Sequence, residues 1–270
     1  MKLLFLGDVV GRAGRDAVVR ELPRLRDRLS IDFAVVNGEN AAGGFGITRE
    51  ICLDLFDAGA DAITLGNHAW DHREALTFIE TEPRLIRPIN YPPGTPGKGV
   101  GLFFTASGKQ VLVMNALGRV FMQALDDPFA AVDRELSQAR LREVADAAIV
   151  DMHAEATSEK MSMGHFCDGR VSLVVGTHSH VPTADAQIFP GGTAYQTDAG
   201  ACADYNSVIG MDKEEPLRRF TTGISQGRMS PANGPATVCG VYVETNDATG
   251  LALRIEPVRV GGRLKETGSI

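Results

Sequence analysis

Residues 171–180 read Val171-Ser172-Leu173-Val174-Val175-Gly176-Thr177-His178-Ser179-His180, a short β-branched run that stops at a glycine before two histidines. A second stretch, Ala62-Ile63-Thr64-Leu65-Gly66-Asn67-His68, has the same order of apolar run, glycine and polar side chains. Short β-branched runs that end at glycine indicate buried strands. Ligands bind outside the carboxyl ends of strands in open α/β sheets, so both stretches predict side chains in a functional site.

Three more apolar runs lead into metal-type side chains in the same way. They end at Asp8, at Asn37-Gly38-Glu39-Asn40 and at His153. Carboxylate oxygens together with neutral imidazoles suit manganese, iron or zinc, whereas a set of oxygens alone would favour magnesium or calcium. We therefore expect an enzyme with a divalent transition metal at the shared edge of these strands.

The histidines are concentrated in these clusters. Five of the six lie in or beside a predicted strand end, and only His165 is assigned to a loop. Cys167 follows His165 closely, but a packing role is favoured over a metal ligand because no second cysteine is near. The candidate ligands run from Asp8 to His180 and must converge, so no domain boundary can be drawn between them. We expect one domain that covers residues 1–270.

The composition is that of an ordinary globular protein, with 44% hydrophobic and 23% charged residues. A net charge of −7 offers no basic surface to a long nucleic-acid backbone, so we expect no stable complex with such a polymer. Bound dications would reverse the field locally and admit a small phosphate ester. Four dispersed cysteines, a short apolar N-terminus and the lack of a membrane-length apolar run predict a soluble, cytoplasmic protein without membrane attachment.

Helical patterns alternate with the first strands, which predicts a parallel sheet. These patterns cover residues 11–29, 49–58 and 71–80. The glycine-rich residues 41–46 match neither a Walker motif nor a dinucleotide-binding motif. We expect them to form a turn that lets Glu39 and Asn40 face the site.

The pattern changes after residue 91. Residues 92–99 form a loop rich in proline and glycine, for which a surface excursion is favoured over a mobile lid. Residues 100–105 and 110–115 predict a hairpin. From residue 186 onward the pattern changes to short strands, and these predict a second sheet packed on the first.

The order of these motifs resembles that of the calcineurin-like metallophosphoesterase superfamily. More closely, the stretches Gly7-Asp8-Val9-Val10-Gly11, Asn37-Gly38-Glu39-Asn40 and Gly66-Asn67-His68-Ala69-Trp70-Asp71 resemble its bacterial YmdB-like branch of cyclic-nucleotide phosphodiesterases. The resemblance covers nearly the whole chain. It implies an α/β fold, a four-layer α/β/β/α sandwich with two mixed β-sheets.

Two positions depart from the general superfamily pattern. Val10 stands where the first motif usually has a histidine, and Glu39 stands where the second motif usually has an aspartate. The resemblance to the YmdB-like branch implies that Asn40 fills the vacated ligand position through its amide oxygen.

The resemblance also implies two divalent metal ions, with the Glu39 carboxylate bridging them. One ion would be held by Asp8, Glu39, Asn40 and His180, and the other by Glu39, Asn67, His153 and His178. Such a bridge can hold ions roughly 3.5–4 Å apart, the spacing of two-metal phosphoryl transfer. A water shared between the ions would lose a proton and act as the nucleophile. Iron or manganese is favoured, with zinc as a third candidate.

His68 has no metal in this assignment, yet it follows Asn67 and so belongs at the rim of the site. It is expected either to protonate the leaving alkoxide or to stabilise the charge that develops on the phosphoryl group, and an imidazole suits the role of general acid. Asp71 and His72 are candidates to orient His68, although Asp71 is equally expected as an N-terminal helix residue.

Three further polar residues are expected to take no part as ligands. Asp151, two residues before His153, is expected to point to the opposite face of its strand. Thr177 and Ser179 alternate with the two histidines of their motif and are expected to face away from them.

The residues themselves predict a metal-dependent hydrolase. The resemblance implies a phosphodiesterase that acts on small phosphodiesters, with 2′,3′-cyclic nucleotides as the favoured substrates. A phosphomonoesterase or a nuclease with the same metals is one alternative, and a regulatory nucleotide-binding protein with a structural metal site is another. His68 favours an enzyme, because a structural metal site does not need it. The native metal, the base preference and the oligomeric state stay open, a homo-oligomer included.

Overall fold

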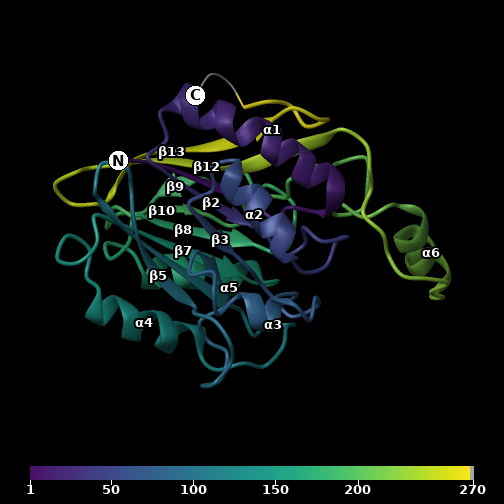
Figure 1. Cartoon of the computed structure of the whole chain (residues 1–270), viewed down its shortest axis with the longest axis horizontal. Helices are drawn as coiled ribbons and strands as arrows, with labels where there is room; N and C mark the ends of the chain where they lie inside the picture. The colour runs from purple at the N-terminus through teal and green to yellow at the C-terminus, as the bar shows by residue number, and fades with distance from the viewer. Residues whose placement is uncertain (268–270) are drawn as a thin grey trace.

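Two β-sheets lie face to face between layers of helices in the computed structural model, which describes residues 1–267 (Figure 1). Helices α1 (Gly11–Leu29) and α2 (Arg49–Asp57) pack on the outer face of the first sheet. Helices α4 (Pro128–Gln138) and α5 (Thr157–Phe166) pack on the outer face of the second. The predicted α/β/β/α sandwich with two mixed sheets is confirmed.

The first sheet has a parallel part and an antiparallel part. The parallel part contains, in spatial order, β1 (Lys2–Leu6), β2 (Phe33–Asn37), β3 (Ala62–Thr64) and β4 (Leu85–Ile86). On the other side of β1 lie the antiparallel strand β12 (Ala236–Thr245) and its partners β11 (Ala203–Asp204) and β13 (Ala252–Val260). The alternation of strand and helix at the start of the chain therefore builds a parallel sheet, as predicted.

The second sheet contains, in spatial order, β5 (Val100–Phe104), β6 (Gln110–Leu117), β7 (Ala147–His153), β8 (Leu173–Thr177), β10 (Ala194–Gln196) and β9 (Gln187–Ile188). Strands β5 and β6 form the predicted hairpin. Strands β6, β7, β8 and β10 run parallel to one another.

The prediction that the strands after residue 186 form the second sheet is wrong for β12 and β13, which lie in the first sheet together with β11. Strand β12 pairs with β1 over the full length of β1, from Lys2 opposite Glu244 to Leu6 opposite Gly240. Because β12 lies between β1 and β13 and is covered on both faces, nearly all of it is buried. Pairing between the two ends of a chain leaves no local pattern in the sequence, so the sheet assignment could not be predicted.

Helix α3 (Ala75–Phe78) is much shorter than the helix predicted over residues 71–80. The segment begins instead with tight turns, in which the Asp71 N–H donates to the His68 carbonyl and the Ala75 N–H to the His72 carbonyl. Donation across three residues is the 3₁₀ pattern, not the α-helical one.

Helix α6 (Glu214–Thr222) projects from the body at the right of Figure 1. His165, expected in a loop, lies in the last turn of α5 and stacks on Phe189. Within residues 1–267, no helix combines the length and the apolar character that a membrane crossing requires.

Successive side chains of β1 point alternately toward the second sheet and toward the helices, and those that face the second sheet form part of the core between the sheets. In β1, Leu3 and Phe5 face the second sheet, where they pack in one cluster with Val113 and Ile149. The intervening Leu4 and Leu6 belong to the cluster under α1 and α2. Successive side chains point to opposite faces of a strand, so β1 is apolar on both sides and fully enclosed. The parallel strands of the two sheets end together, which brings the polar side chains after them to one place.

Candidate metal centre

Two groups of metal-type side chains lie at the carboxyl ends of the parallel strands, and Glu39 belongs to both. The first group contains Glu39, His153 and His178, and the second contains Asp8, Glu39 and His180. In each group one ligand atom from every residue lies within 4.8 Å of the others. Asp8 and Glu39 follow strands of the first sheet, whereas the histidines come from the second. The site therefore exists only where the two sheets meet.

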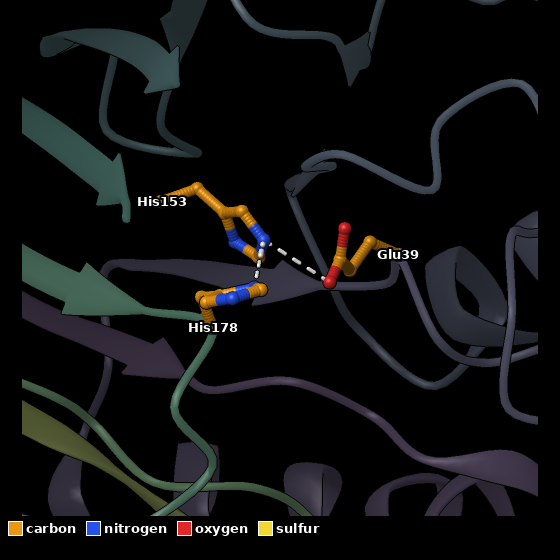
Figure 2. Close-up of side chains that lie close together, drawn as sticks. All are labelled: Glu39, His153 and His178. Carbon is orange, nitrogen blue, oxygen red and sulfur yellow. Dashed lines mark hydrogen bonds and ion pairs between the residues drawn. The ribbon is translucent and has the colours of Figure 1, made fainter. Parts of the chain in front are cut away.

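The first group is centred on His153 (Figure 2). Its Nε2 lies 3.1 Å from Oε1 of Glu39 and 3.2 Å from Nδ1 of His178. The Asn67 Oδ1 lies 3.0 Å from the same nitrogen. All four residues predicted for one metal ion are therefore brought together.

The second group is centred on Asp8. Its Oδ1 lies 3.8 Å from Nε2 of His180, and its Oδ2 accepts a hydrogen bond from the His178 N–H at 3.2 Å. The Asn40 amide donates to Oε1 of Glu39 at 2.9 Å and lies 3.1 Å from Nε2 of His180. The four residues predicted for the other ion therefore also lie together.

Backbone conformation at two points makes this convergence possible. His178 and His180 both have positive φ, 94° and 64°, which turns the chain sharply after β8 and brings both rings into the site. At Gly66, a Cβ would lie 2.3 Å from Oε2 of Glu39 and 2.4 Å from Nε2 of His153. Only glycine fits there, so the glycine that ends the β3 run is needed for close approach.

Burial and opposite charges shift the pKa values of these groups. Burial lowers the pKa of His153, but the carboxylates of Glu39, Asp8 and Asp151 outweigh burial and raise that pKa to about 9. Burial opposes ionisation of Glu39, yet the charge and hydrogen bond of His153 lower the Glu39 pKa. Burial and the neighbouring His153 lower the pKa of His178 to about 3, which leaves its imidazole neutral. Neutral imidazole is the form that binds metals.

The donor set fits divalent cations. Asp8 and Glu39 are fully buried, and Oδ1 of Asp8 has no hydrogen-bond partner among residues 1–267. A buried carboxylate oxygen without a partner is costly unless a cation meets it. The surrounding imidazole nitrogens and side-chain oxygens form the mixed set that manganese, iron and zinc accept.

His68 lies beside the ligand groups without belonging to either. Its Nδ1 is 3.0 Å from Oδ2 of Asp71, and its backbone N–H donates to Oε2 of Glu39 at 3.1 Å. His72 instead lies 3.3 Å from the Ala42 carbonyl. Of the two residues predicted to orient His68, Asp71 contacts the ring.

These side chains open onto a pocket of about 250 Å³. Pockets for drug-sized ligands range from roughly 300 to 1,000 Å³, so this one suits a small substrate. Polar residues and a set of apolar residues both line it. The lining consists of Glu39, Asn40, Phe45, His68, Glu155, His178, Ser179, His180, Ile209, Met211 and Met229.

A family model described as YmdB-like protein matches residues 4–258. The chain belongs to the YmdB-like family. The predicted resemblance is confirmed.

Relatives of this YmdB-like protein match it over nearly the full length. It is 46% identical over 260 residues to the 2′,3′-cyclic-nucleotide 2′-phosphodiesterase of Bacillus subtilis, with 96% of this chain and 97% of the relative covered. A crystal structure of a hypothetical protein from Thermus thermophilus matches with a TM-score of 0.89 and 45% identity, covering 97% of this chain and 100% of that one. A crystal structure of a novel phosphatase from Mycoplasma pneumoniae matches with a TM-score of 0.89 and 33% identity, covering 97% of this chain and 93% of that one.

The prediction that Asp151 points away from His153 is wrong. Its Oδ1 accepts from Oγ1 of Thr177 at 2.6 Å, and that hydroxyl lies 2.8 Å from Nδ1 of His153. Thr64 and Asn37 donate to Oδ2 of Asp151, at 2.6 and 3.0 Å. Side chains two residues apart share a strand face, so the period-two rule itself predicts this arrangement. Thr177 likewise faces His153.

Sequence reasoning missed a buried ion pair behind the two-histidine loop of the YmdB-like chain. The Lys160 ammonium lies 2.7 Å from Oδ2 of Asp198, and both side chains are fully buried. The same oxygen accepts from the backbone N–H and the hydroxyl of Ser179, at 3.1 and 2.7 Å. Ser179 thus faces away from the ligand groups and anchors the loop between His178 and His180. Asp198 follows a short strand and could have been found by that pattern, whereas Lys160 carries no local signal.

Proposed function

We propose that this YmdB-like protein is a metal-dependent phosphodiesterase that hydrolyses small phosphodiesters, with 2′,3′-cyclic nucleotides as substrates. The observation that carries the proposal is the position of Glu39, whose carboxylate belongs to both ligand groups. A carboxylate shared by both groups could bridge two adjacent ions, the arrangement used in two-metal phosphoryl transfer. The activity named for the Bacillus subtilis relative supports the substrate class.

The proposed ligand sets follow the two groups. Asp8, Glu39, Asn40 and His180 would hold one ion, and Glu39, Asn67, His153 and His178 the other. Iron or manganese is favoured, with zinc as the third candidate, because the donors mix nitrogen and oxygen. When bound, such ions supply positive charge that polarises the phosphoryl oxygens and activates water for attack.

His68 is the proposed general acid. Asp71 accepts a hydrogen bond from Nδ1 of His68, which fixes the ring and leaves Nε2 to deliver a proton. Attack of water on phosphorus forms one P–O bond and releases a proton from that water to solvent, while the bond to the ribose oxygen breaks. His68 protonates that leaving oxygen, and the product keeps a phosphomonoester on the neighbouring ribose oxygen.

A phosphomonoesterase is the second candidate, and the similar structure from Mycoplasma pneumoniae, described as a novel phosphatase, favours it. The net charge of −7 argues against a nuclease that grips long nucleic acid. A purely regulatory metal site would not need the His68–Asp71 pair.

We further propose that residues 1–270 act as one domain, because both sheets supply ligands. A cytoplasmic location fits the four free cysteines.

The test compares hydrolysis of 2′,3′-cyclic nucleotides, bis-p-nitrophenyl phosphate and p-nitrophenyl phosphate by protein of measured metal content. We expect the diesters to be hydrolysed faster than the monoester, with two equivalents of metal per chain. A faster monoester reaction would support the phosphatase. No turnover of any ester by metal-replete protein would overturn the enzymatic proposal.

A further inference from the structure

The pocket beside the ligand groups has an apolar wall that phosphate chemistry does not require. Phe45, Ile209, Met211 and Met229 line the pocket together with the proposed ligands and His68. A phosphodiester and its metal ions are polar and charged, so they gain little from thioether and phenyl groups. The wall must therefore meet another part of the substrate or serve packing alone.

The wall is anchored in the protein. Met211 is buried in a small cluster with Val10 and Ala203, and Phe45 and Met229 pack against that cluster while staying partly exposed. The Met211 segment is tied to the Met229 segment because the Asp212 N–H donates to the Ser230 carbonyl at 2.8 Å. The Phe45 loop packs on these two joined segments, so the three side chains present one surface toward the pocket.

Phe45 places this wall directly beside the proposed general acid. Its ring centroid is 5.1 Å from that of His68, with the rings edge to face. The Arg228 guanidinium lies over the Phe45 ring, 5.0 Å from its centroid. Aromatic rings, thioethers and guanidinium planes are the groups on which nucleobases stack.

We propose that Phe45, Met211 and Met229 of the pocket wall, with Arg228 over the Phe45 ring, form a subsite for the nucleobase of the substrate. The proposal rests on the function proposed above and names the part of the nucleotide that this wall receives. The ligand class is a planar heterocycle attached to the ribose whose cyclic phosphate lies at the metal ligands. Because stacking and dispersion carry no hydrogen-bond code, we expect all four bases to be accepted, with purines held more tightly than pyrimidines.

The kinetic test compares 2′,3′-cyclic AMP with a base-free analogue, methyl ribofuranoside 2′,3′-cyclic phosphate. Met229→Ala and Phe45→Leu are expected to raise KM for cyclic AMP about tenfold, the loss typical of one stacking partner. The same variants should leave kcat/KM for the base-free analogue within about twofold. Met161→Ala, which removes an exposed methionine from α5, is the matched control and should leave KM and kcat/KM unchanged for both substrates.

A binding measurement separates this inference from the proposed function. Adenosine has no phosphate, so its binding to the metal-free protein, followed by NMR, does not depend on catalysis. We expect perturbed signals from Met229 and Met211 methyl groups and weaker binding to Met229→Ala.

If Phe45→Leu lowered kcat/KM equally for cyclic AMP and for the base-free analogue, Phe45 would act only by positioning His68, and it would not belong to the subsite. Unchanged KM values together with no adenosine binding would overturn the subsite while leaving the phosphodiesterase intact. Absence of turnover of every ester, with adenosine still bound at the wall, would instead reject the proposed function alone.

Discussion

The Thr177 hydroxyl lies 2.8 Å from Nδ1 of His153 and donates its own proton to Asp151 at 2.6 Å. The hydroxyl can then only accept at His153, so Nδ1 carries a hydrogen. Once the ring is neutral, Nε2 is the nitrogen without a hydrogen, and it faces Glu39, Asn67 and His178. This chain of contacts selects the tautomer of His153 that can bind a metal ion, as hydrogen-bond partners of ligating histidines commonly do.

Thr177→Val should weaken metal binding at the His153 group by about 10- to 100-fold, the usual cost of losing such a partner. The ion held with Asp8 and His180 should be affected much less. Metal titration with two-site analysis measures both affinities. Thr177→Ser keeps the hydroxyl and is the matched control. Equal weakening of both sites would show that Thr177 supports the fold and not the tautomer.

Glu39→Gln should deplete both ions together, because the residue shared by the two ligand groups loses its charge. Metal analysis after purification should give well under one equivalent per chain, against two for the unaltered protein. Asn40→Ala removes a ligand from one proposed set and should lose one ion at most. If Glu39→Gln also loses only one ion, the bridging assignment is wrong.

Metal affinity should rise with pH. In the metal-free protein the pKa of His153 is raised to about 9, so the ring is protonated at pH 7 and must lose its proton to bind metal. We expect about one proton released from His153 and an affinity increase of about tenfold per pH unit from pH 7, levelling off above about pH 9. His178, with a pKa of about 3, contributes no release in this range.

Calorimetry in two buffers of different ionisation enthalpy measures that proton release directly. The Thr177→Val variant should keep the release, because the carboxylates that raise the His153 pKa stay in place. Binding at pH 7 without proton uptake by the buffer would contradict a protonated His153.

The buried Lys160–Asp198 pair should be important for stability. Lys160→Met leaves the Asp198 carboxylate buried without its partner, which typically costs about 3–5 kcal/mol. Urea unfolding measures the loss. Lys160→Met with Asp198→Asn removes both charges and should recover much of it. Lys109→Met, which breaks an exposed pair with Asp247, is the control and should cost no more than about 1 kcal/mol. Equal costs for the two lysines would show that the buried pair contributes no more than an exposed one.

The parts of the structure that the sequence predicted are those with a local signal. Helix α1 has the predicted bounds, and β1 lies in the predicted apolar run before Asp8, because helical spacing and apolar runs are properties of neighbouring residues. The ligand candidates were found in the same way, as polar side chains directly after buried strands. Their convergence needed only the rule that parallel strands end at one edge.

The errors in the sequence-based predictions have three different causes, and contacts between distant segments are the first. The pairing of β12 with β1 and the Lys160–Asp198 pair both depend on the finished fold, so no window of sequence contains them. The short α3 has a different cause, since the turns at His68 and His72 replace the first helical turn. The placement of Asp151 was within reach of the sequence, because strand periodicity puts it on the His153 face.

His68→Ala should lower kcat by about 10²–10⁴-fold, the range for loss of a general acid, while metal content and fold are retained. The residue belongs to neither ligand group, which is why the metals should stay. Inductively coupled plasma analysis and thermal unfolding check those two points. Asp71→Asn should give a smaller loss, because the ring stays but its hydrogen bond to Nδ1 is weakened.

The dependence on the leaving group distinguishes an acid from a charge stabiliser. A ribose alkoxide is a strong base and needs a proton as the P–O bond breaks, whereas p-nitrophenolate leaves with little protonation. His68→Ala should therefore slow cyclic nucleotide hydrolysis much more than hydrolysis of bis-p-nitrophenyl phosphate. A group that only stabilises charge on the phosphoryl oxygens would slow both substrates by the same factor. If His68→Ala slowed both substrates by the same factor, or if the variant lost its metals, His68 would be ruled out as the acid.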